Sequence, residues 1–242
     1  MPVDVVFRAE LDRGRVQPAP ETATCLVDLG LPCHLACPDC CREPAAPAAL
    51  GSARQRLLGA AVAASPRRLR TVFYGGDVFT APHAFAALLA EVGAECEVHG
   101  RELQALVLSD GVDWDRHRCQ ELARRGVACM QVTLDGPAEL HDRLRPLATG
   151  GGSFQRILDS LRYQRDALPV VVRMNALPGD PAVETLAEVL ERAGLFAEPN
   201  PIVLYVAPPA LYREQVLDLL HLVDARGPRP GCGAALGVGD AA

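Results

Sequence analysis

Residues 33–41 read Cys-His-Leu-Ala-Cys-Pro-Asp-Cys-Cys, and the rest of the chain is interpreted around this stretch. Cys33, Cys37 and Cys40 are separated by three and then two residues, directly after an apolar run. Short cysteine-rich loops let several thiolates converge on one iron-sulfur cluster, whose usual ligands are thiolates. Three ligands for four irons leave one iron open to a small molecule, which is typical of catalytic metal sites. We therefore predict that these cysteines hold one 4Fe-4S cluster.

Two other roles for these thiols are less consistent with the sequence. A zinc site would use Cys37 and Cys40 as one pair, but no second Cys-x-x-Cys follows, and the adjacent Cys41 makes a poor fourth ligand. A disulfide framework is disfavoured by the odd count of nine cysteines and by the lack of a secretory signal. Buried structural thiols are common, and that role is predicted for Cys25, Cys96, Cys119 and Cys129.

The pattern Cys-x-x-x-Cys-x-x-Cys directly after a first strand resembles the radical S-adenosylmethionine (AdoMet) enzymes. In that family the three cysteines hold a 4Fe-4S cluster, and the fourth iron is chelated by the amino and carboxylate groups of AdoMet. The resemblance implies Cys33, Cys37 and Cys40 as metal ligands, and it implies one 4Fe-4S cluster and AdoMet as cofactors.

Length and composition fit one large domain. The chain has 242 residues, of which 49% are hydrophobic, and can bury the core of an α/β barrel. Its net charge is -6 and its densest basic cluster is Arg67, Arg68 and Arg70, so no nucleic-acid partner is expected. All 24 basic residues are arginines, which excludes Schiff-base chemistry on lysine, lysine-anchored pyridoxal phosphate and a phosphate-loop lysine.

The sequence carries no targeting or membrane signal that we recognise. Residues 1–15 contain charges that interrupt any signal-peptide core, and the longest weakly polar run, 57–64, is too short to span a membrane. Together with free thiols, these features predict a cytoplasmic protein with no membrane partner.

Apolar β-like runs alternate with amphipathic helical stretches six times from residue 24 onward. The runs are nearly all apolar, as expected for strands buried on both faces. The six expected strands are 24–29, 69–74, 103–108, 128–134, 170–174 and 202–206. The expected helices are 54–64, 82–92, 115–125, one that begins after Ser153 as its cap, one from Asp180 to Gly194, and 211–225.

Repeated strand-helix units imply a parallel sheet with right-handed crossovers. The predicted fold class is α/β, a partial (β/α)6 barrel of parallel strands with outer helices, and the core of radical AdoMet enzymes resembles it. The expected organisation is a strand (3–7) and connector in 1–21, the core barrel in 22–226, and a short tail in 227–242.

In such sheets, functional side chains gather at the C-terminal ends of the strands, where the cysteine loop also lies. Gly75, Gly76 and Asp77 follow the second strand. Two glycines allow close approach of a ligand to the backbone, and a carboxylate accepts hydrogen bonds from an ammonium group. By itself this tripeptide is an ordinary turn. In its position it resembles the family's Gly-Gly-Glu stretch, which implies that it binds the amino group of AdoMet.

Ser109, Asp110 and Gly111 follow the third strand, where relatives often have Thr-Asn-Gly. A turn in which Asp113 caps the next helix explains most of this sequence. We keep only Ser109 as a candidate for cofactor binding.

The fourth strand is followed by the most specific pattern after the cysteines. Residues 133–137 read Thr-Leu-Asp-Gly-Pro, 141–146 read His-Asp-Arg-Leu-Arg-Pro, and 150–154 read Gly-Gly-Gly-Ser-Phe. These closely resemble the Ser-x-Asp-Gly-Pro, His-Asp-x-x-Arg and Gly-Gly-Ser-Phe stretches of peptide-modifying radical AdoMet enzymes. That group includes the anaerobic sulfatase maturases, the ribosomal-peptide (RiPP) maturases and other enzymes with a C-terminal SPASM extension.

Thr133 and Arg145 are the candidates for holding the carboxylate of the cofactor, because a hydroxyl donates and a guanidinium binds carboxylates in a bidentate way. The alternative for Arg145 is an ion pair with Asp142 or Asp135 that ties the loop down.

On the fifth strand, Arg173 and Asn175 are two residues apart and are expected to face the same side. Relatives use a polar residue there near the ribose, so the resemblance implies Asn175 as a further cofactor contact.

Two departures from the family pattern stand out. Asp39 occupies the position before the third cysteine where relatives have an aromatic residue. Residues 230–234 resemble only the opening of the cysteine-rich SPASM extension, and Cys232 alone cannot hold an auxiliary cluster. We therefore expect a short form, a fragment or a vestigial cysteine.

The resemblance implies an oxidoreductase that cleaves AdoMet reductively to a 5′-deoxyadenosyl radical and modifies a peptide or protein side chain. It also implies a flavodoxin-type or ferredoxin-type reductant. No catalytic carboxylate is identified, because residues 202–208 offer only Tyr205. Two alternatives remain open: a non-catalytic iron-sulfur or zinc-binding scaffold, since a fold does not guarantee activity, and a radical enzyme that acts on a small metabolite.

Overall fold

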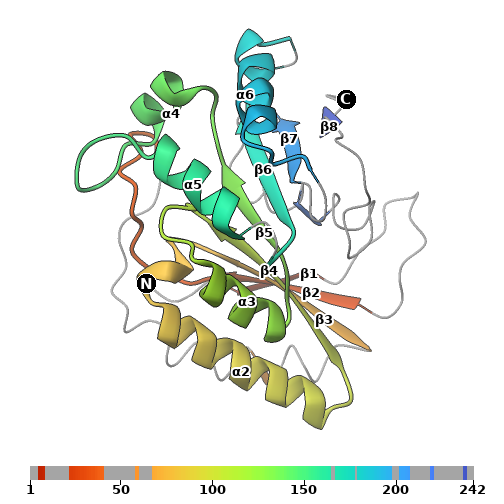
Figure 1. The fold of residues 1–242 in the computed structure, drawn as a ribbon. Helices are drawn as coiled ribbons and strands as arrows, with labels where there is room; N and C mark the ends of the chain where they lie inside the picture. The colour runs from red at the N-terminus through yellow and green to blue at the C-terminus, as the bar shows by residue number, and fades with distance from the viewer. Residues whose placement is uncertain are drawn as a thin grey trace. The chain divides into compact units, whose positions relative to one another are not determined.

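The computed structural model describes residues 5–8, 22–40, 58–59, 67–164, 167–177, 179–197, 202–207, 219–220 and 237–238 (Figure 1). The chain divides into two compact units. Unit 1 holds residues 1–33, 42–108 and 121–128, and unit 2 holds residues 34–41, 109–120 and 129–242.

Unit 1 contains the first four strands. β1 (Val5–Arg8) is antiparallel to β2 (Thr22–Asp28), which pairs in parallel with β3 (Arg68–Tyr74), and β3 pairs in parallel with β4 (Glu102–Ser109). The middle of β3 and of β4 is buried on both faces, in keeping with their apolar sequences.

Two helical elements follow β3. The short 3-10 helix η2 (Val78–Thr80) leads into α2 (Pro82–Val98), which has Pro82 in its first turn. Phe85, Leu88, Leu89, Val92 and Cys96 form the buried face of α2 at helical spacing. The ring of Phe85 meets that of Phe73 edge to face, 5.1 Å between centroids, and this contact packs α2 against β3.

Unit 2 contains most of β5 (Val127–Thr133) and all of β6 (Val170–Asn175), β7 (Val203–Ala207) and β8 (Gly237–Val238), which pair in parallel in that order. The register places Thr133 opposite Arg173, and Arg173 opposite Tyr205. The helices are α4 (Ala138–Leu144), α5 (Phe154–Gln164) and α6 (Pro181–Arg192), while α3 (Arg116–Arg124) is shared between the units.

The predicted alternation of parallel strands and helices is confirmed, with corrected boundaries. α2 continues six residues beyond the expected end at 92, and α4 occupies a stretch that we had described only as a motif. The prediction that Asp113 caps the third helix is wrong: the Asp115 Oδ1 atom accepts the hydrogen bond from the backbone N–H of Arg118 at 2.9 Å. Asp180 caps α6, because its side chain accepts from the Ala182 N–H at 2.9 Å. Ser153 does precede α5, but its hydroxyl donates to the Arg145 carbonyl, and Asp142 accepts from the N–H groups at the start of this helix.

Several predictions fall wholly or mostly outside the described residues. The helices expected at 54–64 and 211–225 are described only at 58–59 and 219–220, which are helical. Cys41 and Cys232 lie outside the described residues. Cys25, Cys96, Cys119 and Cys129 are buried, as predicted. Among the described helices, none combines the length and the apolar character that a membrane crossing requires.

Candidate active site

The cysteine loop spans the boundary of the two units: Cys33 ends a segment of unit 1, and Cys37 and Cys40 lie in unit 2. None of the three forms a disulfide bond; Cys33 and Cys40 are exposed and Cys37 is half-buried. Pro38 and Asp39 form a turn that is closed by a 3.1 Å hydrogen bond from the Cys40 N–H to the Cys37 carbonyl. This turn places the thiols of Cys37 and Cys40 at the two ends of one short loop, as a cluster site needs.

Within unit 2 the loop is fixed to the segment that follows α4. Leu35 forms an antiparallel bridge with Leu147, the Ala36 N–H donates to the Pro146 carbonyl, and the Ala148 N–H donates to the His34 carbonyl, both at 2.8 Å. The loop therefore has strand-like support beside its cysteines.

Arg145 lies beside Cys37, with its Nη1 atom 3.9 Å from the thiol sulfur. Burial raises the pKa of the Cys37 thiol, and the positive charge of Arg145 opposes that rise. A guanidinium in this position favours the thiolate form that metal binding requires. One of the predicted carboxylate-binding residues thus lies next to one of the predicted cluster ligands.

Asp135 holds the guanidinium of Arg145 in place. The Nε atom of Arg145 donates to Asp135 Oδ2 at 2.7 Å, and Asp135 is buried. Of the two ion pairs considered for Arg145, the one with Asp135 is therefore present. The other candidate, Asp142, accepts hydrogen bonds from the backbone N–H groups of Ser153 and Phe154 at the start of α5, both at 2.8 Å.

The second oxygen of Asp135 binds Asn175 at the end of β6. Asp135 Oδ1 accepts from the Asn175 backbone N–H at 3.0 Å and from its side-chain amide at 2.9 Å. The Asn175 Oδ1 atom in turn accepts from Arg173 Nε at 3.0 Å, which confirms that these two β6 residues face the same side. Arg173 is fully buried, and its guanidinium lies over the ring of Tyr205 at 5.6 Å.

His141, on α4, connects the start and the end of the segment from Asp135 to Ser153. Its Nδ1 atom accepts from the Asp135 backbone N–H at 3.1 Å, and its Nε2 atom lies 3.0 Å from Ser153 Oγ. The Ser153 hydroxyl donates to the Arg145 carbonyl at 2.6 Å, so its oxygen is left to accept from Nε2–H. Burial, together with the charge of Arg145, lowers the pKa of His141 to about 4. The ring is therefore neutral at physiological pH, with its proton on Nε2.

Gly75, Gly76 and Asp77 lie in unit 1, at the end of β3. Gly76 has φ of 78°, and a Cβ there would overlap the carbonyl oxygens of Leu31 and Pro32. The buried Asp77 caps η2, because its Oδ1 accepts from the Phe79 N–H at 2.7 Å. Gly76 and Asp77 thus have structural roles, in close backbone packing and in capping η2. Their predicted binding of an ammonium group would be an additional role.

Ser109 and Thr133 occupy the ends of β4 and β5. The Ser109 hydroxyl oxygen accepts from Trp114 Nε1 at 2.7 Å and from the Gly111 N–H at 3.2 Å, which explains a serine here through the turn itself. Thr133 is half-buried at the last position of β5, opposite Arg173. Cofactor binding by either residue stays a prediction.

The sequence analysis did not predict four residues of unit 2 that lie at or beside the site and hold its side chains or loops in place. They are His34, Asp110, Asp135 and His141. Asp110 and Asp135 each follow the end of a parallel strand, which was the signal available for them. His34 and His141 are recognised only from their contacts.

The side chains present in unit 2 fit the two groups that the sequence predicts. Cys37 and Cys40 offer thiolate ligands, which suit an iron-sulfur cluster. Arg145 offers N–H donors with the planar geometry that binds carboxylates.

Comparison with protein families gives one match to the chain. The sequence profile of the Radical SAM superfamily matches residues 31–193, well over half of the chain. A comparison with curated protein sequences finds no match.

Several solved structures of proteins with bound AdoMet are similar in fold. They include anSMEcpe with bound AdoMet (TM-score 0.56, 15% identity, 86% of this chain and 62% of that chain) and the same protein with AdoMet and the Cp18Cys peptide (0.56, 15%, 88% and 63%). Streptococcus suis SuiB bound to S-adenosylmethionine has a TM-score of 0.51 at 13% identity, covering 90% of this chain and 46% of that chain.

The chain spans less than two thirds of these structures' length. At such low identity the likeness concerns the fold alone, and it agrees with the predicted α/β, partial (β/α)6 barrel class. The family match is the stronger finding, because it begins two residues before Cys33 and extends through α6. The chain therefore belongs to the Radical SAM superfamily, a family of enzymes that use a 4Fe-4S cluster and AdoMet.

Proposed function

We propose that this protein is a radical AdoMet enzyme that modifies a side chain of a peptide or protein. Membership of the superfamily supports the enzyme class. Support for the substrate class comes from residues 133–154, which resemble the peptide-modifying group. It comes also from the similarity in fold to anSMEcpe, a protein solved with a bound peptide.

In this proposal Cys33, Cys37 and Cys40 hold the cluster, and residues 22–226 form the core domain between the connector 1–21 and the tail 227–242. When bound, the reduced cluster supplies the electron that cleaves AdoMet to methionine and a 5′-deoxyadenosyl radical. The chain's own part is to bind and orient the cofactor and the substrate.

The observation that carries the proposal is the position of Arg145. Its guanidinium lies within 3.9 Å of the Cys37 sulfur and is directed by the 2.7 Å ion pair with Asp135. The carboxylate of AdoMet, if bound by Arg145, would therefore lie beside the cysteine loop. An open iron of the cluster would chelate the methionine part of AdoMet at the same place. AdoMet binding to an open iron requires such a carboxylate receptor next to a cluster ligand.

The remaining candidates complete the proposed receptor for AdoMet. Gly75, Gly76 and Asp77 would receive the ammonium group, and Thr133 would assist Arg145 at the carboxylate. Asn175 is oriented by Asp135 and Arg173 and would contact the ribose hydroxyls. Ser109 is the least supported member, since its oxygen already accepts two hydrogen bonds.

The proposal includes a flavodoxin-type or ferredoxin-type reductant, no nucleic-acid or membrane partner, and a cytoplasmic location. The net charge of -6 and the small size of the densest basic cluster, Arg67, Arg68 and Arg70, support the absence of a nucleic-acid partner.

The test is reductive cleavage of AdoMet by the reconstituted protein. Under anaerobic conditions with a chemical reductant, wild type should release 5′-deoxyadenosine even without substrate, and Cys37→Ala should not. If wild type with a confirmed reduced cluster neither binds AdoMet nor releases 5′-deoxyadenosine, the enzymatic function is wrong and a non-catalytic scaffold is the better description. Where wild type does cleave AdoMet, addition of candidate precursor peptides should accelerate the release of 5′-deoxyadenosine, whereas small metabolites should not.

A further inference from the structure

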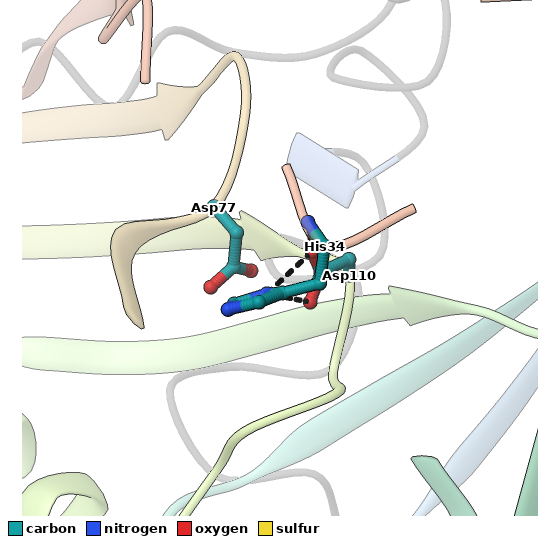
Figure 2. Close-up of side chains that lie close together, drawn as sticks. All are labelled: His34, Asp77 and Asp110. Atoms are coloured by element: carbon teal, nitrogen blue, oxygen red, sulfur yellow. Dashed lines mark hydrogen bonds and ion pairs between the residues drawn. The ribbon is translucent and has the colours of Figure 1, made fainter. Parts of the chain in front are cut away.

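His34 is held by the carboxylate of Asp110, a residue to which the proposed function assigns no role. Its backbone N–H donates to Asp110 Oδ2 at 2.9 Å, and its ring Nδ1 lies 2.9 Å from the same oxygen and 3.2 Å from Oδ1 (Figure 2). Asp110 Oδ1 also accepts from the Val112 N–H at 3.0 Å. One carboxylate thus ties the cysteine loop to the segment that follows β4.

The environment makes this contact strong. The Asp110 side chain is only 4% exposed, so its charge depends on the hydrogen bonds that it accepts within the protein. His34 is 21% exposed, and the other edge of its ring lies 3.4 Å from Asp113 Oδ2, which is 42% exposed and paired with Arg156. The buried contact with Asp110 is therefore the one that fixes the ring, and the contact with Asp113 is screened by water.

Both backbone polar groups of His34 are used within unit 2. The N–H binds Asp110, and the carbonyl accepts from the Ala148 N–H at 2.8 Å. His34 is therefore the point at which the loop is fastened from two sides. The His34 N–H belongs to the peptide group that follows Cys33, so its direction constrains the backbone at the first predicted ligand.

We propose that Asp110, acting through His34, is a positioning residue for the iron-sulfur site. This inference rests on the proposed function, in which the cysteine loop holds the cluster. Hydrogen bonds from the protein to cluster sulfurs and nearby charge both tune the reduction potential. Asp110 binds the His34 N–H, so that this donor does not reach a sulfur, and it places a buried negative charge beside the loop. Both effects keep the potential of the cluster low.

Four variants of the reconstituted full chain test this role. Asp110→Ala removes every contact, Asp110→Asn keeps a side-chain oxygen that can accept from the His34 N–H, and His34→Ala removes the ring but keeps the backbone bond. Asp113→Asn is the matched control, because it alters the exposed contact of the same ring and the exposed pair with Arg156 but leaves Asp110 in place. The readouts are iron content, the electron paramagnetic resonance (EPR) signal of the reduced cluster, its midpoint potential and the rate of AdoMet cleavage, with circular dichroism to establish folding.

Asp110→Ala should change the EPR signal, raise the midpoint potential and lower the cleavage rate by about tenfold or more, the usual effect of losing a group that orients a metal ligand. Asp110→Asn should keep the wild-type signal with a smaller rise in potential, His34→Ala should show an altered signal, and Asp113→Asn should match wild type. An Asp110→Ala protein that is folded, loaded with iron and unchanged in signal and potential would overturn the inference. So would an Asp110→Asn protein as altered as Asp110→Ala.

If Asp110→Ala does not fold, His34→Ala decides, and an unaltered signal in that variant overturns the inference. Failure of the proposed function has a different result. Wild type with a confirmed reduced cluster would then bind no AdoMet and release no 5′-deoxyadenosine, while the EPR signal and midpoint potential of the variants would still test the role of Asp110. A wild type that takes up no iron would overturn both.

Discussion

Arg145 is oriented by its neighbours in the way that the proposed cofactor binding requires. Its Nε atom is committed to the buried Asp135, whose other oxygen is occupied by Asn175. A guanidinium that is already oriented by an ion pair loses little conformational freedom when it also binds a second carboxylate. Pairing with Asp135 and binding of a cofactor are therefore compatible roles for this residue.

We predict that Arg145→Ala lowers the affinity for AdoMet without loss of the cluster. The loss of a charge-assisted hydrogen bond should cost about 1.5 to 3 kcal/mol of binding free energy, or roughly ten- to a hundredfold in Kd. Equilibrium binding of AdoMet to the reconstituted protein measures it, with iron content determined in parallel. Arg143→Ala, at an exposed position two residues away, is the matched control and should bind like wild type. Unchanged affinity in Arg145→Ala would remove Arg145 from the proposed receptor.

His141 makes the stability of unit 2 sensitive to acid. Its pKa in the folded protein is about 4, below the ordinary value of 6.5, so the folded state binds fewer protons than the unfolded state between these values. The stabilising contribution is complete above pH 6.5 and is lost as the pH falls toward 4. Protonation at Nδ1 would also break the hydrogen bond from the Asp135 N–H.

The free energy of unfolding should therefore fall by about 2 kcal/mol from pH 7 to pH 5 through His141 alone. In His141→Asn this part of the pH dependence should disappear, while stability at pH 7 falls by about 1 to 3 kcal/mol because buried partners are left unpaired. Urea unfolding at both pH values measures the two quantities. His99→Asn, at an exposed position on the surface of unit 1, should retain the wild-type pH dependence. Equal slopes in wild type and His141→Asn would contradict the assignment.

At the residue scale, the sequence predicts Arg145 and Asn175 as cofactor contacts but does not predict that Asp135 connects them. Asp135 and Asp142 were both plausible partners for Arg145, and spacing along the chain does not distinguish them. The choice depends on α4, which turns Asp142 toward the start of α5 and leaves Asp135 at the end of β5. Contacts of this kind arise from tertiary packing, which has no periodic signal in the sequence.

At the scale of elements, two glycines make opposite contributions to the stability of the folded protein. Gly76 has positive φ, and its missing Cβ makes room for the carbonyl oxygens of Leu31 and Pro32, the residues that lead into the cysteine loop. Gly93 lies inside α2, and a Cβ there would meet no atom within 4 Å. The first glycine is required by close packing, whereas the second only weakens its helix.

Alanine substitutions at the two positions should thus have opposite signs. Gly76→Ala should lower the free energy of unfolding by about 1 to 3 kcal/mol, because the backbone is strained and cannot yield to the new methyl group. Gly93→Ala should raise it by about 0.5 to 1 kcal/mol through better helix propensity. Chemical denaturation of both variants compares them directly. A neutral Gly76→Ala would show that the chain before the cysteine loop is not packed as described.

Element boundaries were predictable where a side chain marks them. Asp180 and Pro181 mark the start of α6, and both act as the sequence indicates. The end of α2 was misplaced because Gly93 resembles a stop, while the helix ends at His99 and Gly100, where φ is 62°. α4 was missed because it has seven residues and no side-chain cap, so its pattern is too short to be periodic.

At the scale of the whole molecule, the cysteines fall into two chemical classes. Burial raises the pKa of Cys25 and of Cys129 to about 12, so at neutral pH these thiols are protonated and poor nucleophiles. Cys33 and Cys40 are exposed, and Cys37 is half-buried beside Arg145. The sequence separated these classes correctly because closely spaced cysteines in a loop cannot all be core residues, whereas isolated cysteines in apolar runs can.

Alkylation with iodoacetamide, mapped by mass spectrometry, should separate the classes experimentally. In the iron-free protein at pH 8, Cys33 and Cys40 should react readily, Cys37 more slowly, and the buried Cys25 and Cys129 only after denaturation. After reconstitution to about four irons and four sulfides per chain, the three loop cysteines should become protected together, because each thiolate is bound to iron. Cys33→Ser, Cys37→Ser and Cys40→Ser should each abolish the protection of the other two, whereas Cys129→Ser should leave it intact. Full iron uptake with a loop cysteine still reactive would mean that the cluster has another ligand, and the open iron on which AdoMet binding depends would then have to be located elsewhere.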